Sequence, residues 1–290
     1  MNDHDFTVAV YNRTTSKVDE FLEGPAKGTK VIGCYDLKSF VANLKLPRRI
    51  MLMVKAGSVV DSFIEQLLPY LERGDIIIDG GNSLYNDSDR RTHELHKKGM
   101  LFVGAGVSGG EEGARHGPSI MPGGNYAAWP AVKPIFQAIS AQVDNEPCCD
   151  WVGNDGAGHY VKMVHNGIEY AEMQLLAETF AVLANQMSYP EIVAVLQEMN
   201  QGSEASYLLE ITAEILEKKE GKHFLVDLIL DQASSKGTGM WSSSAALALG
   251  SVNTMMSASV FARYLSSFKT ERVALSARKP KAKKQVDLDA

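Results

Sequence analysis

Residues 158–170, GHYVKMVHNGIEY, form the stretch from which the rest of the chain can be interpreted. Long or branched apolar residues and a single internal glycine predict a helix here. One face of that helix carries polar residues at i, i+3, i+4, i+7 and i+8, namely Lys162, His165, Asn166, Glu169 and Tyr170. A base, an acid and hydrogen-bonding groups on one face are typical of a cleft wall that presents proton-transfer groups to a polar ligand. The alternative is a solvated face with an ordinary Lys/Glu pair.

Length and composition indicate a soluble globular protein with two domains. The chain has 290 residues, of which 45% are hydrophobic and 22% are charged. Its net charge of -6 argues against a general nucleic-acid binder, and no apolar run approaches the length of a membrane span. The polar start, MNDHD, resembles neither a signal nor a transit peptide. Because Cys34, Cys148 and Cys149 lack a metal-ligand pattern, we expect reduced thiols, no metal site and a cytoplasmic location.

The two halves of the chain differ in pattern. Up to about residue 153, short β-branched runs alternate with helical segments, which predicts a parallel sheet covered by helices. Expected strands cover residues 7–11, 31–34, 49–54, 76–79 and 100–104, with helices near 16–22, 37–44, 59–71 and 90–98. Later helices are expected near 157–186, 190–200, 204–218 and 241–267. We therefore predict a Rossmann-like, doubly wound α/β domain at 1–153 and an all-α domain at 154–290.

Polar loops follow several of these strands, and ligands bind at such loops in open α/β sheets. The first loop is Asn12-Arg13-Thr14, at a position where NAD sites place an acidic residue on the ribose 2′-hydroxyl. An arginine there can pair with a 2′-phosphate through its planar fork of donors, which indicates NADP. A turn with a solvated arginine is the alternative, because many strands end in Asn-Arg.

Paired glycines mark two further loops, residues 79–83 (DGGNS) and 106–113 (GVSGGEEG). Glycines after strands let the backbone approach a ligand, and consecutive N–H groups can cradle an anion. Asn82 adds a donor and an acceptor at the same level. The alternative for both loops is a tight turn that only the fold requires. The stretch Met121-Pro122-Gly123-Gly124 is predicted to be such a structural turn.

The helical half contains a candidate anion site at Lys236-Gly237-Thr238-Gly239. Lysine and threonine among glycines suit a phosphate on a small substrate, although the spacing is not that of a nucleotide P-loop. Arg263, further along the chain, is a candidate for the same anion, but a lone helical arginine is more often solvated. The basic run at 278–284 is expected to be a flexible, solvated terminus.

Together these motifs resemble the family of 6-phosphogluconate dehydrogenases, the NADP-dependent decarboxylating enzymes of the pentose phosphate pathway. The resemblance runs from about residue 2 to about residue 272 and keeps the family's order through blocks at 11–14, 79–83, 106–114, 162–170 and 236–239. It implies oxidative decarboxylation of 6-phospho-D-gluconate to D-ribulose 5-phosphate and CO2, with reduction of NADP.

The resemblance also implies roles for individual residues. Lys162 would be the general base and Glu169 the general acid. The cofactor would be held by Asn12, Arg13, Thr14, Val54, Lys55, Ala56 and Asn82. The substrate would be bound by Asn82, Ser108, Gly109, Gly110, His165 and Asn166, and its phosphate by Tyr170, Lys236, Thr238 and Arg263.

These side chains suit that reaction. Oxidising the 3-hydroxyl requires a base, and a lysine can serve if burial or a cationic neighbour lowers its pKa toward neutrality. The resulting β-keto acid loses CO2 once its ketone oxygen is stabilised, which protonated Lys162 can do without a metal. Glu169 lies two helical turns further on, a separation that suits protonation of C1 of the enediol at the other end of a small sugar acid.

The chain departs from the family pattern at both ends. The family's first strand and its Gly-x-Ala-x-x-Gly turn, which holds the cofactor pyrophosphate, are absent. In the order 3-2-1-4-5-6 that strand is central, so the strands at 7–11 and 49–54 should lose their inner neighbour. We therefore expect a rearranged or poorly stable first domain. The family's last helices and the tail that reaches the partner subunit do not follow Arg272, which removes the basis for predicting its homodimer here.

Two other interpretations stay open. The absent glycine-rich turn favours a noncatalytic relative that acts as a binding or regulatory fragment. A related β-hydroxyacid dehydrogenase with a smaller substrate is the other interpretation. Lys236 and Arg263 argue against it, because a substrate without a phosphate would not need them.

Overall fold

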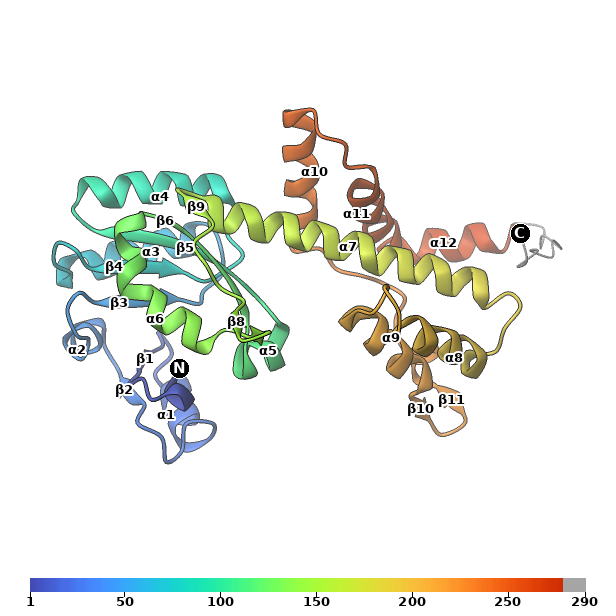
Figure 1. The fold of residues 1–290 in the computed structure, drawn as a ribbon, viewed down its shortest axis with the longest axis horizontal. Coiled ribbons are helices and arrows are strands. Elements are labelled where there is room, and N and C mark those ends of the chain that lie inside the picture. The colour runs from blue at the N-terminus through green and yellow to red at the C-terminus, as the bar shows by residue number, and fades with distance from the viewer. Residues whose placement is uncertain (279–290) are drawn as a thin grey trace. The chain divides into compact units, whose positions relative to one another are not determined.

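The computed structural model describes residues 1–278 and divides into two compact units, one ending at His165 and one beginning at Asn166 (Figure 1). Helix α7 (Ala157–Leu183) runs through this division. The domain boundary near residue 153 stays a prediction, and the expected basic terminus lies outside the described residues from position 279 onward. Within the described part of the chain, no helix combines the length and the apolar character needed to cross a membrane.

A five-stranded sheet forms the centre of the first unit, in the order β3-β4-β5-β6-β9. β3, β4 and β5 are mutually parallel, β6 runs antiparallel to β5, and β9 is parallel to β6. The bounds are β3 (Arg49–Leu52), β4 (Ile76–Asp79), β5 (Leu101–Ser108), β6 (Ser119–Gly124) and β9 (Gly153–Asn154). The parallel part follows the strands expected from the sequence.

Helices bury both faces of this sheet. Strand β4 is buried along its whole length, as a central parallel strand should be. Ile77 belongs to a core with side chains of α3 (Ser58–Leu67) and α4 (Tyr85–Lys97). Ile76 and Ile78 belong to a second core with side chains of α6 (Trp129–Ile139). Alternate residues of one strand thus serve two cores, which is the predicted doubly wound arrangement.

The first two strands of the chain form a separate two-stranded sheet. β1 (Ala9–Tyr11) pairs in parallel with β2 (Ile32–Cys34), and α1 (Ser16–Glu23) and α2 (Leu37–Ala42) accompany them. Among residues 1–278, no ladder joins β1 to β3. The prediction that these two strands lack a common inner neighbour is therefore confirmed.

Short elements complete the first unit. They are the 3-10 helices η1 (Asn2–His4), η2 (Leu68–Tyr70) and η3 (Tyr126–Ala128), helix α5 (Gly110–His116), and the paired strands β7 (Gln142–Val143) and β8 (Glu146–Pro147). The cysteines are free thiols, and burial raises the pKa of Cys149 to about 12.

Two local predictions were wrong. Residues 121–124, expected as a turn, lie inside β6, because Gly123 and Gly124 leave room for backbone that a side chain would strike. Residues 241–267, expected as one helix, form α10 (Thr238–Leu249) and α11 (Thr254–Ser266). Gly250 ends α10 in the left-handed conformation, with φ of 66°, where glycine is favoured.

The second unit is built from helices. α8 (Tyr189–Met199) and α9 (Tyr207–Glu217) pack against each other around a core that includes Ile192, Leu196 and Leu209. Side chains cap the starts of both helices, since Ser188 forms a capping box with Glu191 and Ser206 accepts a hydrogen bond from the Leu209 amide. The remaining elements are α10, α11, α12 (Lys269–Ser276), η4 (Leu225–Leu228) and the pair β10 (Lys219–Glu220) and β11 (His223–Phe224).

Candidate active site

The first turns of α7 lie directly on β5 and β6, because glycines on both sides remove the side chains that would intervene. A Cβ added at Gly158 would strike the carbonyl oxygen of Gly104, and one added at Gly123 would strike the Gly158 amide. A Cβ added at Gly106 would collide with the Cβ of Lys162. The glycines therefore set where Lys162 sits relative to the end of β5.

On α7, a charged side chain is more deeply buried than two apolar neighbours. Lys162 is 6% exposed, whereas the apolar Val161 and Ile168 are 39% and 55% exposed. The alternative of a solvated Lys/Glu face therefore does not hold for Lys162. Glu169 is partly buried on the same helix.

The end of β5 presents the predicted serine to α7. Ser108 is the last residue of the strand, and its Oγ lies 3.4 Å from Nε2 of His165. Gly109 and Gly110 follow with φ of 132° and 63°, values that favour glycine. Within the first unit, Lys162, His165 and Ser108 are thus contributed by α7 and β5, and the backbone after Ser108 depends on glycine.

A buried ion network holds the turn that bears Asn82. Asp79 is fully buried at the end of β4, where it accepts hydrogen bonds from the Gly81 amide at 3.1 Å and from the Ser83 hydroxyl at 2.6 Å. Arg91, 1% exposed, donates to Asp79 at 3.3 Å. Asn82 itself is exposed. Asp79 therefore fixes the residues on both sides of Asn82, whose side-chain amide stays accessible.

Arg91 extends this network toward α3. Its Nε donates to Asp61 at 2.8 Å and its Nη2 donates to the Gly57 carbonyl at 2.9 Å. The hydrogen bond from Arg91 is the main reason why the pKa of Asp61 lies below its ordinary value. Sequence reasoning missed both Arg91 and Asp61, because neither lies in a motif and their pairing is set by the packing of α3 on α4.

His159 is a second buried group that the motif analysis did not select. It is 1% exposed, and its Nδ1 lies 2.6 Å from the Ser88 hydroxyl. A Cβ at Gly104 would come within 2.9 Å of the same nitrogen, so β5 makes room for the ring. Desolvation by burial lowers the pKa of His159, partly opposed by the negative charge of Asp79. The only signal in the sequence was its position three residues before Lys162.

Five of the seven predicted cofactor residues line a cavity of about 620 Å³ in the first unit. Its polar rim includes Asn12, Arg13, Thr14 and Lys55, at the ends of β1 and β3. The Asn12 side chain accepts from the Thr14 amide at 2.8 Å, which shapes this loop. Val54 also lines the cavity, whereas Ala56 follows Lys55 without lining it, and Asn82 does not line it either.

In the second unit, α7 and α11 bring together two of the predicted phosphate ligands, Tyr170 and Arg263. The Arg263 guanidinium lies 3.5 Å from the centroid of the Tyr170 ring, and its Nη1 donates to the Ser234 carbonyl at 2.6 Å. Gly239 allows this approach, since a Cβ there would lie 2.7 Å from the Tyr170 ring. Arg263 is therefore a positioned cation, rather than the freely solvated helix residue that was the alternative.

Asn166 and Thr238 meet in the same unit. The Asn166 amide donates to the Thr238 hydroxyl at 3.4 Å, and Thr238 is 3% exposed at the start of α10. Lys236 lies in the loop before α10 and is exposed. No group of three or more His, Cys, Asp or Glu side chains within the described residues is arranged to hold a metal ion.

Comparisons with known proteins cover the whole chain. A family model described as the NAD binding domain of 6-phosphogluconate dehydrogenase matches residues 1–153, and one described as the C-terminal domain of the same enzyme matches residues 158–290. A decarboxylating 6-phosphogluconate dehydrogenase from Dictyostelium discoideum is 60% identical over 283 residues, covering 95% of this chain and 57% of the relative. This chain thus spans little more than half the length of that relative.

Solved structures show the same likeness. The 6-phosphogluconate dehydrogenase of Plasmodium falciparum, studied alone, with its cofactor NADP+ and with its substrate 6-phosphogluconate, matches with a TM-score of 0.94 at 40% identity. That match covers all of this chain and 63% of the Plasmodium chain. A 3-hydroxyisobutyrate dehydrogenase from Salmonella typhimurium matches with a TM-score of 0.67 at 16% identity, which shows a shared fold. The two family models together account for nearly every residue, and the chain belongs to the 6-phosphogluconate dehydrogenase family.

Proposed function

We propose that this chain carries the catalytic and binding residues for oxidative decarboxylation of 6-phospho-D-gluconate to D-ribulose 5-phosphate and CO2, with reduction of NADP. The observation that carries the proposal is a lysine only 6% exposed on α7, set against glycines of β5. A buried lysine beside the end of a sheet strand is a side chain that can serve a dehydrogenase as a base. The reaction itself is proposed from the family to which the chain belongs.

Lys162 acts as the general base in this proposal. It takes the proton of the substrate 3-hydroxyl while hydride leaves C3, so it must be neutral when the substrate binds. Protonated by that step, it then donates to the ketone oxygen and stabilises the negative charge that develops as CO2 leaves. His165, 3.4 Å from the Ser108 hydroxyl, is assigned to the substrate hydroxyls next to that lysine. Ser108, Gly109 and Gly110 are assigned to the carboxylate region.

Glu169 completes the reaction as the general acid. After CO2 leaves, the enediol requires a proton at C1, and a carboxylic acid can supply it. Glu169 lies on the same helix as Lys162, two turns later. The partial burial of its side chain is consistent with an acid that exchanges its proton with solvent between turnovers.

The phosphate of the substrate is assigned to the second unit. Arg263 is held by the Tyr170 ring and the Ser234 carbonyl, yet a guanidinium has further donors for an anion. Lys236 and Thr238 supply a flexible cation and a hydroxyl, and Asn166 is within 3.4 Å of that hydroxyl. This cluster favours the dehydrogenase of a phosphorylated sugar acid over a β-hydroxyacid dehydrogenase for a smaller substrate.

NADP fits the polar rim of the cavity in the first unit. Arg13 offers a planar fork of donors suited to a 2′-phosphate, and Asn12 and Thr14 flank it. Val54, Lys55, Ala56 and Asn82 are assigned to the rest of the cofactor. When bound, NADP accepts the hydride from C3. The residues named above orient the substrate, and Lys162 and Glu169 transfer the protons.

A noncatalytic binding fragment is the second candidate, and the split between β1 and β3 favours it. Asn12, Arg13 and Thr14, which line the cavity, follow β1, and β1 belongs to a separate sheet of only two strands. Such a chain would bind substrate through its second unit without turning it over.

Location and assembly follow from the same proposal. We assign the chain to the cytoplasm, where the pentose phosphate pathway supplies this substrate. The exposed apolar side chains of α10 and α11, among them Leu247 at 81% and Phe261 at 68%, support a homodimer or a further covering segment, which light scattering would distinguish.

The test is an assay of the purified chain with 6-phosphogluconate and NADP, in which NADPH and CO2 are measured together. We expect equal amounts of both products, and their loss in a Lys162→Ala variant. Binding of 6-phosphogluconate without any product would establish the binding fragment instead. Normal turnover by the Lys162→Ala variant would show that the base has been misassigned.

A further inference from the structure

Two side chains of α7 pack against glycines of β5 that lie two residues apart. A Cβ added at Gly104 would come within 2.9 Å of Nδ1 of His159, and one added at Gly106 would strike the Cβ of Lys162. Residues two apart in a strand project from the same face of a sheet, and residues three apart share one face of a helix. His159 and Lys162 therefore rest on one face of β5, each against a glycine.

The same register continues to the end of the strand. Ser108, two residues after Gly106, has its Oγ 3.4 Å from Nε2 of His165, which is three residues after Lys162. Two strand residues rise about 6.6 Å and three helical residues about 4.5 Å, so only a few such pairs can stay matched. The three matched pairs therefore define both the rotation of α7 about its axis and its shift along β5.

His159 is also held by α4. Its Nδ1 lies 2.6 Å from the Ser88 hydroxyl, and the two residues are 1% and 0% exposed. The Cβ that Gly104 lacks would lie 3.4 Å from the Ser88 oxygen, so β5, α4 and α7 meet at this point. α4 also binds the start of α7, because Asp89 accepts a hydrogen bond from the Gly156 amide at 2.6 Å. The Ser88–His159 pair thus joins α7 to α4 inside the core.

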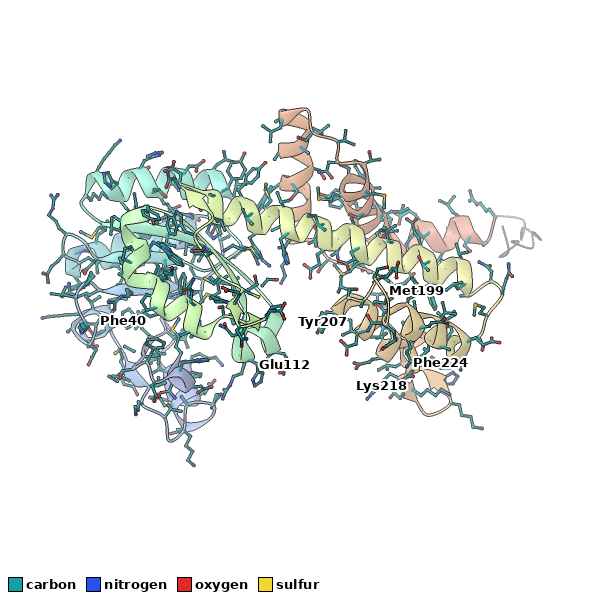
Figure 2. All side chains as sticks on the ribbon, viewed as in Figure 1. Phe40, Glu112, Met199, Tyr207, Lys218 and Phe224 are labelled. Atoms are coloured by element: carbon teal, nitrogen blue, oxygen red, sulfur yellow. The ribbon has the colours of Figure 1, made fainter. Side chains whose placement is uncertain are left out.

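The histidine ring also faces the turn that leads to Asn82. Burial lowers the pKa of His159, the negative charge of Asp79 and the backbone of Gly81 favour the charged form of the ring, and the positive charge of Arg91 disfavours it. Glu112, on α5 beyond the end of β5, is exposed instead (Figure 2). His159 therefore contacts the structural network of the Asn82 turn on one side and lies one helical turn before Lys162 on the other.

We propose that His159 is a positioning residue for the reaction, and that its hydrogen bond with Ser88 holds α7 in the register that sets the Lys162 amine relative to the substrate. This inference rests on the proposed role of Lys162 as the general base. His159 itself touches neither substrate nor cofactor. Without the bond, the first turns of α7 can shift on β5, and a misplacement of about 1 Å can lower a rate about 10²-fold.

The test compares Ser88→Ala with Thr92→Val, a matched control one turn later on α4. Ser88→Ala removes the hydroxyl that bonds to His159. Thr92→Val removes a hydroxyl that is equally buried and donates to the Ser88 carbonyl at 2.8 Å, a hydrogen bond that does not involve His159. With 6-phosphogluconate and NADP, we expect Ser88→Ala to lower kcat about tenfold to hundredfold while both KM values stay within about threefold. Thr92→Val should keep kcat within about threefold.

The primary deuterium isotope effect separates positioning from folding. With 6-phosphogluconate deuterated at C3, a displaced base slows the step in which hydride leaves C3, so the isotope effect on kcat should rise in Ser88→Ala. A smaller folded fraction would lower kcat but leave the isotope effect unchanged. An unchanged isotope effect in Ser88→Ala, or an equal rise in Thr92→Val, would overturn the proposal.

Substitution of the ring gives a rescue test. The asparagine amide stands where Nδ1 of the ring stood, so His159→Asn can still bond to Ser88, whereas His159→Leu cannot. His159→Asn should keep kcat within about threefold of the wild type, and His159→Leu should lower it at least about tenfold. Adding Ser88→Ala to His159→Leu should lower kcat less than about threefold further, because the bond is already lost. Equal kcat for the two His159 variants would contradict the proposal.

A measurement without turnover keeps this inference separate from the proposed function. If the wild-type chain forms no NADPH, the proposed function fails, and hydrogen exchange then decides whether the bond holds the register of α7. Ser88→Ala should speed amide exchange at residues 160–163 at least about threefold more than at residues 76–79 of the same unit. Equal acceleration in both segments, or none at residues 160–163, would overturn the proposal.

Discussion

The two units differ in whether their charged side chains are buried or exposed. In the first unit, Asp75, Asp79, Arg91 and Lys162 are all at most 6% exposed. In the described part of the second unit, the ion pairs of Asp231 with Lys269 and Arg272 lie on the surface, and the buried polar side chains Thr238, Ser242 and Ser259 are uncharged. A buried charge is tolerated only with partners, whereas an accessible cation stays free to meet an anion. The comparison supports the proposal that the general base Lys162 lies in the first unit and the phosphate-binding cations in the second.

Removing the centre of the buried network should have the largest effect on stability. Arg91→Met leaves Asp79 fully buried without its cation, and breaking such pairs costs about 3–5 kcal/mol. Urea unfolding followed by circular dichroism would measure the loss. A loss of unfolding free energy below about 1 kcal/mol would mean that the buried ion network contributes no more than a surface pair, and the two units would not differ in this respect.

The close approach of α7 to β5 should be almost as sensitive. Gly106→Ala places a methyl group against Lys162, and overpacking of this kind costs about 1–3 kcal/mol. The matched control is Gly113→Ala in α5, where the nearest atom to the new Cβ is 3.9 Å away and the change should be neutral or slightly stabilising. Equal thermal shifts for both variants would mean that α7 does not depend on the glycines.

The sequence predicted the order of strands and helices up to β5, because a short apolar run such as Ile76-Ile77-Ile78-Asp79 between turns is typical of a buried strand. It also predicted the helix that carries Lys162. It did not predict the elements between β5 and α7. It failed at Met121–Gly124, where proline and glycines signal a turn but serve close packing inside β6. His159 and Arg91 were missed because contacts with Ser88 and Asp79 arise only when distant segments pack.

His159 should make the stability of the first unit depend on pH. Burial lowers its folded-state pKa, so below about pH 6.5 the unfolded chain takes up a proton that the folded chain refuses. Stability is therefore complete above that pH and declines below it, by at most about 1.4 kcal/mol per pH unit for one proton.

Unfolding free energies at pH 7.5 and 5.5 would measure this slope in the wild type and in His159→Gln. The variant should lose part of the slope, whereas His96→Gln, at an exposed position, should retain it. An unchanged slope in His159→Gln would assign the pH dependence to other groups.

The smallest effect is expected in the exposed pair of the second unit. Lys269→Ala removes one partner of Asp231, but Arg272 remains at 2.8 Å and the cluster lies in water. Surface pairs contribute about 0–1 kcal/mol, so thermal unfolding should hardly change. A loss as large as that of Arg91→Met would contradict the comparison.

The proposed roles of Lys162 as the base and Arg263 as a phosphate ligand are tested most directly by the separate effects of two variants on kcat and KM for 6-phosphogluconate. Lys162→Ala should lower kcat by about 10²–10⁴-fold with little change in KM. Arg263→Ala should raise KM at least about tenfold while kcat stays within about threefold, because it removes a charged hydrogen-bond donor from binding. A wild-type chain that forms no NADPH, a Lys162→Ala variant with normal kcat, or an Arg263→Ala variant with unchanged KM would contradict the account.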